Sequence, residues 1–368
     1  MKSTPCGAAR GFGIRLALLP VVFCWLSGCT SPAAAAGPAD RVTSKAFRRA
    51  AQRIMASVVK IETFGGLSGR VGGARQEGIS KPGEGPTTGV VISPDGYIIT
   101  STFNFIRKPP LITVVLADGS RHIAELLGRD ETRKICLLKI DKAPPLAVPE
   151  MVAHEQLRVG QWAISLGLGY GDKEPAISAG IISANRRISA RAVQTDANIS
   201  PANYGGPLVD IEGRLIGICV PLSPMSGKEA AGSEWYDSGI GFAVPLHGAE
   251  SLIARLKNKE TIAPGRLGIR VAALSPDGAG AKIAAVQPDS PAAKAGLEKE
   301  DALLALEGEA ILDTVHFSTV LGRYVAGDKI KIKVRRAENE VVAEAELAAG
   351  EDLPTSGKQA PQPGSEQP

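Results

Sequence analysis

The chain has 368 residues, 44% hydrophobic and 22% charged, a composition that allows a globular core and more than one domain. Its formal net charge of +4 is small for this length and no basic stripe is clustered in the sequence, so nothing favours a nucleic-acid-binding protein. Abundant glycine and proline (42 and 26 residues), with only 4% aromatic residues, favour many short strands joined by turns over long helical bundles.

The first residues have the pattern of an export signal. Basic residues precede an apolar run over 16–26 that is too short to span a bilayer as a mature helix. The arrangement of this run just before Cys29 resembles a bacterial lipoprotein signal, which predicts a signal peptide over 1–28 and a lipid on Cys29 that attaches the protein to a membrane. An ordinary secretory signal cut near 33–36 is the alternative. Thr30, which stands where an aspartate often accompanies inner-membrane retention, favours the outer membrane for a protein on the periplasmic face of the envelope.

The remaining cysteines and the histidines give no metal pattern. Cys136 and Cys219 each lie inside an apolar, strand-like run, which predicts two buried thiols, with a disulfide as the alternative in an oxidising envelope. The four histidines are scattered and none is spaced with a cysteine or carboxylate cluster, so neither a metal nor a cofactor is expected.

The next residues predict a tether, a helix and then a series of strands. Alanine and proline dominate 29–43, a helix-like spacing of apolar residues follows over 44–57, and the glycine-rich, polar stretch 64–87 predicts a long mobile loop. Asp95-Gly96 and Asp118-Gly119 supply the positive φ of hairpin turns. Strands are predicted at 58–61, 89–93, 97–101, 112–116, 122–127, 135–140, 163–166, 177–184, 207–209, 215–220 and 241–245, before a short helix over 248–257. So many short strands indicate an all-β barrel or sandwich.

A second module follows the boundary at Pro264-Gly265. Strands are predicted at 269–273, 281–286, 302–306 and 330–334, and helices at 291–295 and 316–324. This pattern predicts a compact α+β domain over 262–349. The last stretch, 350–368, is nearly free of apolar residues and is predicted to be a disordered tail.

Four landmarks in the first module resemble the HtrA family of serine proteases. They are the hairpin 88–100, the segments 128–130 and 135–140, the segments 194–197 and 205–209, and the strand 239–245. Their order and spacing imply a mainly β protein: a trypsin-like pair of six-stranded β-barrels over 44–260, with the active-site cleft between the barrels, followed by the α+β domain.

The residues at the expected catalytic positions differ from those of the family. The resemblance places Phe103 at the position of the histidine, Lys134 at that of the aspartate, Tyr204 at that of the nucleophilic serine, and Ala202 at that of the glycine that helps bind the oxyanion. Phenylalanine cannot accept a proton, and a phenol with a pKa of about 10 needs a base to become a nucleophile. No residue is therefore assigned a catalytic role.

The replaced positions leave two interpretations. In the first, Phe103, Lys134 and Tyr204 fill the cleft: Phe103 and Tyr204 pack there and plug it, and Lys134 reaches solvent. In the second, Lys134 and Ser200 form a rewired catalytic dyad, because a lysine of depressed pKa can act as a base.

The second module resembles the PDZ domains of the same family. Arg266, Leu267, Gly268 and Ile269 resemble the carboxylate-binding loop, 286–297 the typical PDZ segment, and 327–334 a closing strand. The resemblance implies that a peptide adds as a strand beside this loop. Phe317, Val320 and Leu321 are expected to line the groove, with core packing as the alternative. The usual Pro-Gly-Asp turn is replaced by Lys299-Glu300-Asp301, which puts the shape of that turn in question.

Together these features predict an inactive HtrA-like envelope lipoprotein that binds peptides, C-termini or unfolded proteins through its PDZ domain, as a chaperone-like or regulatory scaffold. The resemblance also implies a homo-trimer, or a mixed trimer with active relatives. A serine endopeptidase with residual or rewired activity is the alternative. A third hypothesis is a surface anchor whose 64–87 loop and tail contact other envelope components.

Overall fold

The computed structural model describes residues 38–64, 87–106, 108–141, 145–169, 174–223, 236, 238–272 and 281–350. The predicted signal peptide, Cys29 and the tail beyond 350 lie outside these ranges, as does nearly all of the predicted loop 64–87. Within the described part, no helix combines the length and apolar character needed to cross a membrane.

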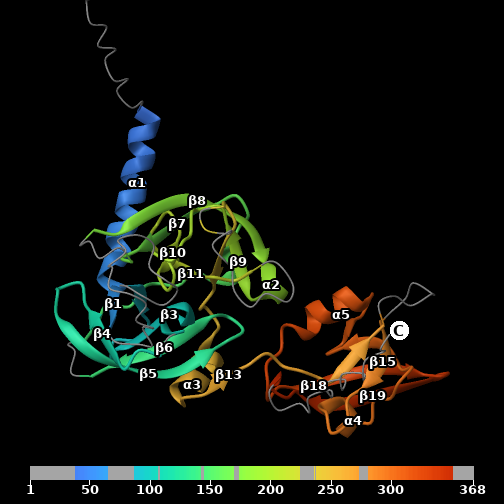
Figure 1. The fold of residues 1–368 in the computed structure, drawn as a ribbon. Helices are drawn as coiled ribbons and strands as arrows, with labels where there is room; N and C mark the ends of the chain where they lie inside the picture. Colours follow the sequence, from blue (N-terminus) through green and yellow to red (C-terminus); the bar gives the residue numbers. More distant parts are fainter. Residues whose placement is uncertain are drawn as a thin grey trace, which may run out of the picture. The chain divides into compact units, whose positions relative to one another are not determined.

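The first barrel follows helix α1 (Pro38–Ile54) and contains β1 (Val58–Phe64), β2 (Thr87–Val91), β3 (Tyr97–Ser101), β4 (Leu111–Val115), β5 (Arg121–Asp130) and β6 (Ile135–Ile140). The strand order is β5-β4-β1-β2-β3-β6, and pairing of β5 with β6 closes it (Figure 1). The predicted turns Asp95-Gly96 and Asp118-Gly119 are confirmed, with Gly96 at φ 95° and Gly119 at φ 86°. Short β13 (Thr261–Ile262) adds to β5 in parallel.

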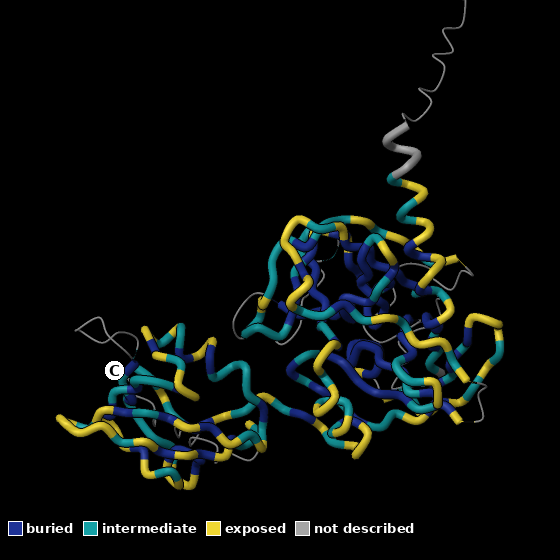
Figure 2. The backbone as a smooth tube through the Cα atoms, turned by 180° about the vertical axis from the view of Figure 1, so that it is seen from behind, coloured by how far each residue is buried: buried dark blue, intermediate teal, exposed yellow. Residues whose placement is uncertain are grey.

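The second barrel contains β7 (Trp162–Gly167), β8 (Ala176–Arg186), β9 (Ala192–Thr195), β10 (Pro207–Val209), β11 (Leu215–Val220) and β12 (Gly241–Val244). It closes in the order β10-β11-β12-β9-β8-β7. Helix α3 (Glu250–Lys257) follows it. The tube in Figure 2 is dark blue along the barrel strands and yellow mainly at turns, because the apolar faces of the strands fill the barrel interiors. The trypsin-like double barrel is therefore confirmed.

The PDZ domain is a sheet in the order β14-β15-β16-β18-β19, with two helices. Its elements are β14 (Ile269–Val271), β15 (Ala281–Val286), α4 (Pro291–Lys294), β16 (Ala302–Leu306), β17 (Glu309–Ala310), α5 (Thr314–Leu321), β18 (Lys329–Arg336) and β19 (Asn339–Glu346). The substituted turn at Lys299-Glu300-Asp301 forms with Glu300 at φ 77°. Strands β14 and β19 are the two edges of this sheet.

Several predicted boundaries were wrong. Helix α1 begins at Pro38, inside the predicted tether, and the strands β9 and β19 were not predicted. A one-turn element, α2 (Arg187–Ala190), also lies between β8 and β9, with Ile188 and Ser189 in left-handed conformations that residues other than glycine seldom adopt. Local sequence gives little signal for such a turn because its conformation depends on contacts made elsewhere in the fold.

Candidate functional site: the filled cleft and the PDZ edge

The loop before β10 is fixed by close backbone contacts. Its turn closes through Asn203 N–H, which donates to Ser200 O at 2.9 Å, and Gly206 N–H, which donates to Asn203 O at 2.8 Å. Gly205 has φ 84°, and a methyl group added to it would lie 2.2 Å from Thr100 Oγ1. A larger residue cannot stand there without moving the backbone, so the loop holds residue 204 in one place against the first barrel.

Tyr204 is the centre of a buried aromatic cluster. It is 3% exposed, and its ring meets the ring of Phe103 edge-on, with centroids 5.1 Å apart. The ring of Tyr236 lies on it at 6.2 Å, also edge-on. Offset and edge-on pairs of this kind each add about 0.5–1.5 kcal/mol beyond the burial itself. Phe103 and Tyr204 are both buried and pack against each other, whereas nothing in the sequence around Tyr236 indicated its contact with Tyr204.

Lys134 lies beside the same cluster through its backbone. Its carbonyl accepts hydrogen bonds from Thr102 N–H at 2.9 Å and from the Ser101 hydroxyl at 3.1 Å, immediately before Phe103 in the chain. The structure therefore brings the segments that carry Phe103, Lys134 and Tyr204 together. The expectation that Lys134 reaches solvent was wrong: the residue is only 9% exposed, and its Nζ lies 3.6 Å from Glu131 Oε2.

Asp130, the last residue of the 128–130 landmark, organises the turn that carries Lys134. Its fully buried carboxylate accepts from the backbone N–H groups of Thr132 and Arg133 at 2.8 and 3.0 Å, and from the guanidinium of Arg133 at 2.8 Å. A buried charge is stable only when such partners surround it. The turn thus depends on Asp130, and it leaves Lys134 at φ 58°.

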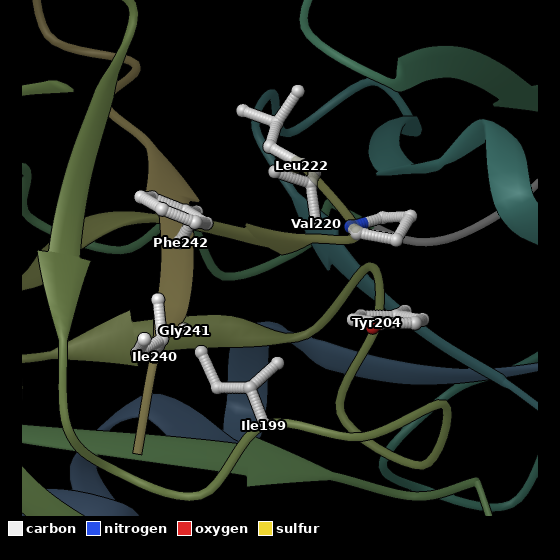
Figure 3. Close-up of a pocket in the computed structure, with 8 residues that line it drawn as sticks. Ile199, Tyr204, Val220, Leu222, Ile240, Gly241 and Phe242 are labelled. Carbon is white, nitrogen blue, oxygen red and sulfur yellow. The ribbon is translucent and has the colours of Figure 1, made fainter. Parts of the chain in front are cut away.

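A small pocket lies beside Tyr204, and Figure 3 shows the residues that line it. Its volume is ≈ 10 Å³, about that of one water molecule and far below that of a side chain. Ile199 fills it: a methyl group built on Gly241, in the opposite wall, would lie 2.6 Å from Ile199 Cδ1. The lining residues are Ile199, Tyr204, Val220, Pro221, Leu222, Ile240, Gly241 and Phe242. Neither Ile199 nor Gly241 was predicted to matter, because only the fold places them opposite each other.

Ser200 and Ala202 are held in the loop by other partners. The Ser200 hydroxyl is 3.4 Å from Asn203 Oδ1, and Ser200 is 8% exposed. The carbonyl of Ala202 accepts from the Thr88 hydroxyl at 3.3 Å, and Ala202 is not among the residues with positive φ. Among the described contacts none joins Lys134 to Ser200, so the second interpretation, the dyad, has no contact that favours it.

The predicted carboxylate-binding loop lies at the start of β14. Gly268 has φ 76°, and a methyl group built on it would lie 2.3 Å from Ser290 Cβ, so this position requires glycine. Leu267 is buried, Ile269 is half-buried and Arg266 is exposed. Arg266 N–H donates to Ala348 O at 2.8 Å, which anchors the loop to the end of the sheet.

Helix α5 carries the other predicted groove residues. Phe317 and Val320 are buried in the domain core at 3% and 1% exposure, so their packing is that of core residues, whereas Leu321 is half-buried at the edge of this core. Thr314, which the sequence did not single out, donates its hydroxyl to Ala272 O at 2.8 Å. This bond ties the start of α5 to the end of β14.

The cysteines are two separate free thiols. Cys136 and Cys219 are both fully buried, as expected, and burial raises the pKa of each thiol, that of Cys219 to about 12. A thiol of such high pKa is not a nucleophile at neutral pH. In the described residues, no group of three histidine, cysteine or acidic side chains could hold a metal ion.

Both domains match models of known protein families. Residues 87–218 match the model of a trypsin-like peptidase domain and residues 265–347 that of a PDZ domain. A probable periplasmic serine endoprotease, DegP-like, from Halomonas elongata is 32% identical over 68% of this chain and 53% of its own length. The corresponding protein of Rickettsia prowazekii is 28% identical over 69% of this chain and 51% of its own length. The chain is similar to HtrA/DegP-type proteins in both of its domains.

Solved structures agree with this assignment. The HtrA-type protease AlgW, determined with a decapeptide, has a TM-score of 0.63 and 28% identity, covering 82% of this chain and 98% of that one. A serine endoprotease from Yersinia pestis has a TM-score of 0.60 and 26% identity, covering 82% and 97%. The HtrA/DegP-like chain spans about half the length of the curated relatives that it matches. Their names support a periplasmic or envelope location.

Proposed function

We propose that this HtrA/DegP-like protein is catalytically inactive and binds peptides or unfolded envelope proteins through its PDZ domain. The observation that carries the proposal is the aromatic pair at the centre of the cleft. Peptide hydrolysis in this fold needs a hydroxyl nucleophile and a histidine that takes its proton. The sequence resemblance assigns Phe103 and Tyr204 to those two positions, and their rings are in edge-on contact and nearly excluded from solvent.

The filled pocket supports the same proposal independently. A protease binds a side chain of its substrate beside the nucleophile, and cavities that hold such groups measure hundreds of cubic ångströms. The pocket beside Tyr204 holds ≈ 10 Å³ because Ile199 packs across it onto Gly241. A pocket this small beside Tyr204 has no room for a substrate side chain, which supports the proposal.

Peptide binding is proposed for the β14 edge. Gly268 O accepts from Gln287 N–H and Ala272 N–H donates to Lys282 O, both at 2.9 Å. Gly268 and Ala272 therefore turn these backbone groups toward β15, inside the sheet. Alternation along an antiparallel strand then turns the N–H and C=O groups of Ile269 and Val271 to the outer side. An added peptide strand can pair with these groups, and the Gly268 loop can take its terminal carboxylate.

The test measures cleavage and capture separately. We expect no cleavage of unfolded casein and no labelling by a fluorophosphonate, together with saturable binding of a labelled peptide that ends in a free apolar residue. Gly268→Ala should weaken this binding at least tenfold, because its new methyl group collides with Ser290. Gly308→Ala is the matched control, since Gly308 also has positive φ but open space around it.

Two results would overturn the proposal. Casein cleavage that survives Tyr204→Ala but stops with Ser200→Ala would establish the alternative, a rewired serine endopeptidase, which the names of the relatives favour. Equal binding of the free-acid and the C-terminally amidated peptide would remove the PDZ loop from the mechanism. We also propose attachment to a membrane through a lipid on Cys29 and assembly as a trimer. Globomycin-sensitive processing and analytical ultracentrifugation test these two points.

A further inference from the structure

The second edge of the PDZ sheet is formed by β19, opposite the β14 edge. Its side chains alternate: Ala343 and Ala345 are buried, whereas Glu340, Glu344 and Glu346 are exposed. Val342, between the glutamates, is 66% exposed. One face of this strand therefore presents acidic side chains around one apolar residue.

Among the described residues, β19 pairs with β18 alone, which leaves its outer side without a partner strand. Leu347 N–H donates to Asp328 O at 2.9 Å, and Gly327 N–H donates to Leu347 O at 2.8 Å. The register with β18 continues without interruption from Glu346 back to Asn339, so alternate residues turn toward β18. The residues that turn their N–H and C=O groups outward are the same exposed ones, Val342 and the three glutamates.

A hollow of ≈ 600 Å³ lies between this edge and helix α4. Its lining combines small apolar residues with four charged side chains. The lining residues are Asp289, Pro291, Lys294, Ala295, Ala326, Gly327, Glu344, Ala345, Glu346, Leu347, Ala348 and Ala349. A hollow of this size accommodates several side chains of a bound segment.

The charge of the hollow is negative. Asp289, Glu344 and Glu346 carry three negative charges on its rim and Lys294 one positive charge, which leaves a net charge of −2. Within the described part of the chain, no ion pair joins any of these four side chains to a partner. On β18, Lys331 lies opposite Glu344 and Lys329 lies opposite Glu346, on the same exposed face. A row of basic side chains on β18 thus lies beside a row of acidic side chains on β19.

We infer that the β19 edge and its hollow bind an extended basic segment of a partner protein. The segment pairs its backbone with the outward groups of β19 and places alternate Lys or Arg side chains beside Glu344 and Glu346, with an apolar residue over Val342. Its basic row continues the order already set by β18 and β19, in which opposite charges face each other across strands. A second copy of the chain fits poorly, because pairing β19 with β19 would set glutamates against glutamates. This site is distinct from the β14 edge.

The test uses the purified protein and the probe peptide acetyl-Gly-Lys-Val-Lys-Val-Val-Gly-amide, in which the two lysines and the second of the last two valines share one face. Its amidated end keeps it out of the carboxylate-binding loop, so failure here leaves the proposed function untouched. We expect saturable binding by fluorescence anisotropy, weakened by salt. Glu344→Gln and Glu346→Gln should each reduce affinity about two- to fivefold, as for an exposed ion pair. Glu338→Gln removes the same charge at the distal turn of the β18–β19 hairpin and should change nothing.

Two further measurements decide between a strand and a loose ionic contact. A peptide N-methylated at alternate backbone amides, on the side that faces β19, should bind at least tenfold more weakly, since it cannot pair with the edge. Equal binding of both peptides, equal losses for Glu338→Gln and Glu344→Gln, or no binding at all would overturn the inference. So would concentration-dependent dimerisation through β19 in ultracentrifugation, because the occupant would then be a second copy.

Discussion

Replacing Tyr204 by alanine tests whether its ring fills the cleft. The ring is 3% exposed and contacts the rings of Phe103 and Tyr236, so its removal leaves a cavity in the second barrel. Removal of a buried aromatic side chain typically costs about 3–5 kcal/mol of unfolding free energy. We expect Tyr204→Ala to lie in this range. Tyr204→Phe keeps the ring and should cost only about 0.5–1.5 kcal/mol, the usual contribution of one hydrogen-bonding group.

A double-mutant cycle separates the aromatic contact from general burial. Tyr204→Ala and Phe103→Ala together should cost less than the sum of the two single changes, with a coupling of about 0.5–1.5 kcal/mol. Urea unfolding followed by tryptophan fluorescence gives these values. All three tryptophans, Trp25, Trp162 and Trp235, lie outside the PDZ domain. The change in fluorescence therefore reports unfolding of the first module and not of the PDZ domain.

If Tyr204→Ala lowers the free energy of unfolding by less than about 1 kcal/mol, well below the range for a buried ring, the ring does not fill the cleft. A coupling of zero with Phe103→Ala would also refute the packing of the two rings, because the edge-on contact would then carry no energy. A large loss of stability with unchanged peptide capture would instead support a filled cleft that has no part in binding.

Three further predictions concern buried and strained groups. A hydrogen bond from Arg336 holds the pKa of Asp301 below its usual value, so this pair stabilises the fold above about pH 4, the usual range of an unfolded Asp, and the contribution is lost as pH falls through the lowered pKa. Asp301→Asn should therefore cost about 1–3 kcal/mol at pH 7 and much less at pH 3, measured by urea unfolding. Cys136 and Cys219 should react with a thiol reagent only after unfolding, because both are buried. Lys134→Asn should raise the free energy of unfolding by up to about 1 kcal/mol, since asparagine tolerates the left-handed conformation better, measured by fluorescence-detected unfolding.

Strands bounded by clear turn residues could be predicted from the sequence. The bounds of β6, β10 and β11 agree with the expected ones because apolar runs end at glycines or charged turns. Strand β19 was missed because its turn uses Ala337, a residue without glycine's freedom, at φ 52°. Its exposed glutamates also conceal the period-two pattern of the buried residues Ala343 and Ala345.

A residue of the site could be placed from the sequence only where the neighbouring residues in the chain determine its position in the fold. Phe103 and Tyr204 follow family-like segments of fixed geometry, so their contact could be expected before the structure. The burial of Lys134 could not be predicted, because it depends on the turn that Asp130 holds through hydrogen bonds from Thr132 and Arg133. Ile199 packs against Gly241 from another strand, and a contact of this kind depends on the register of the whole barrel.

The loop around Tyr204 is held in place by contacts that do not depend on the side chain at 204. The contacts that hold it are those of its backbone: the turn between Ser200 and Asn203, the crowded position of Gly205, and the Thr87 hydroxyl, which donates to Tyr204 O at 3.0 Å. None of them requires a serine at 204. A hydroxyl in an active enzyme must stay accessible, whereas an aromatic ring there becomes buried and adds apolar contacts. The tyrosine ring at 204 therefore adds to the stability of the loop that carries it.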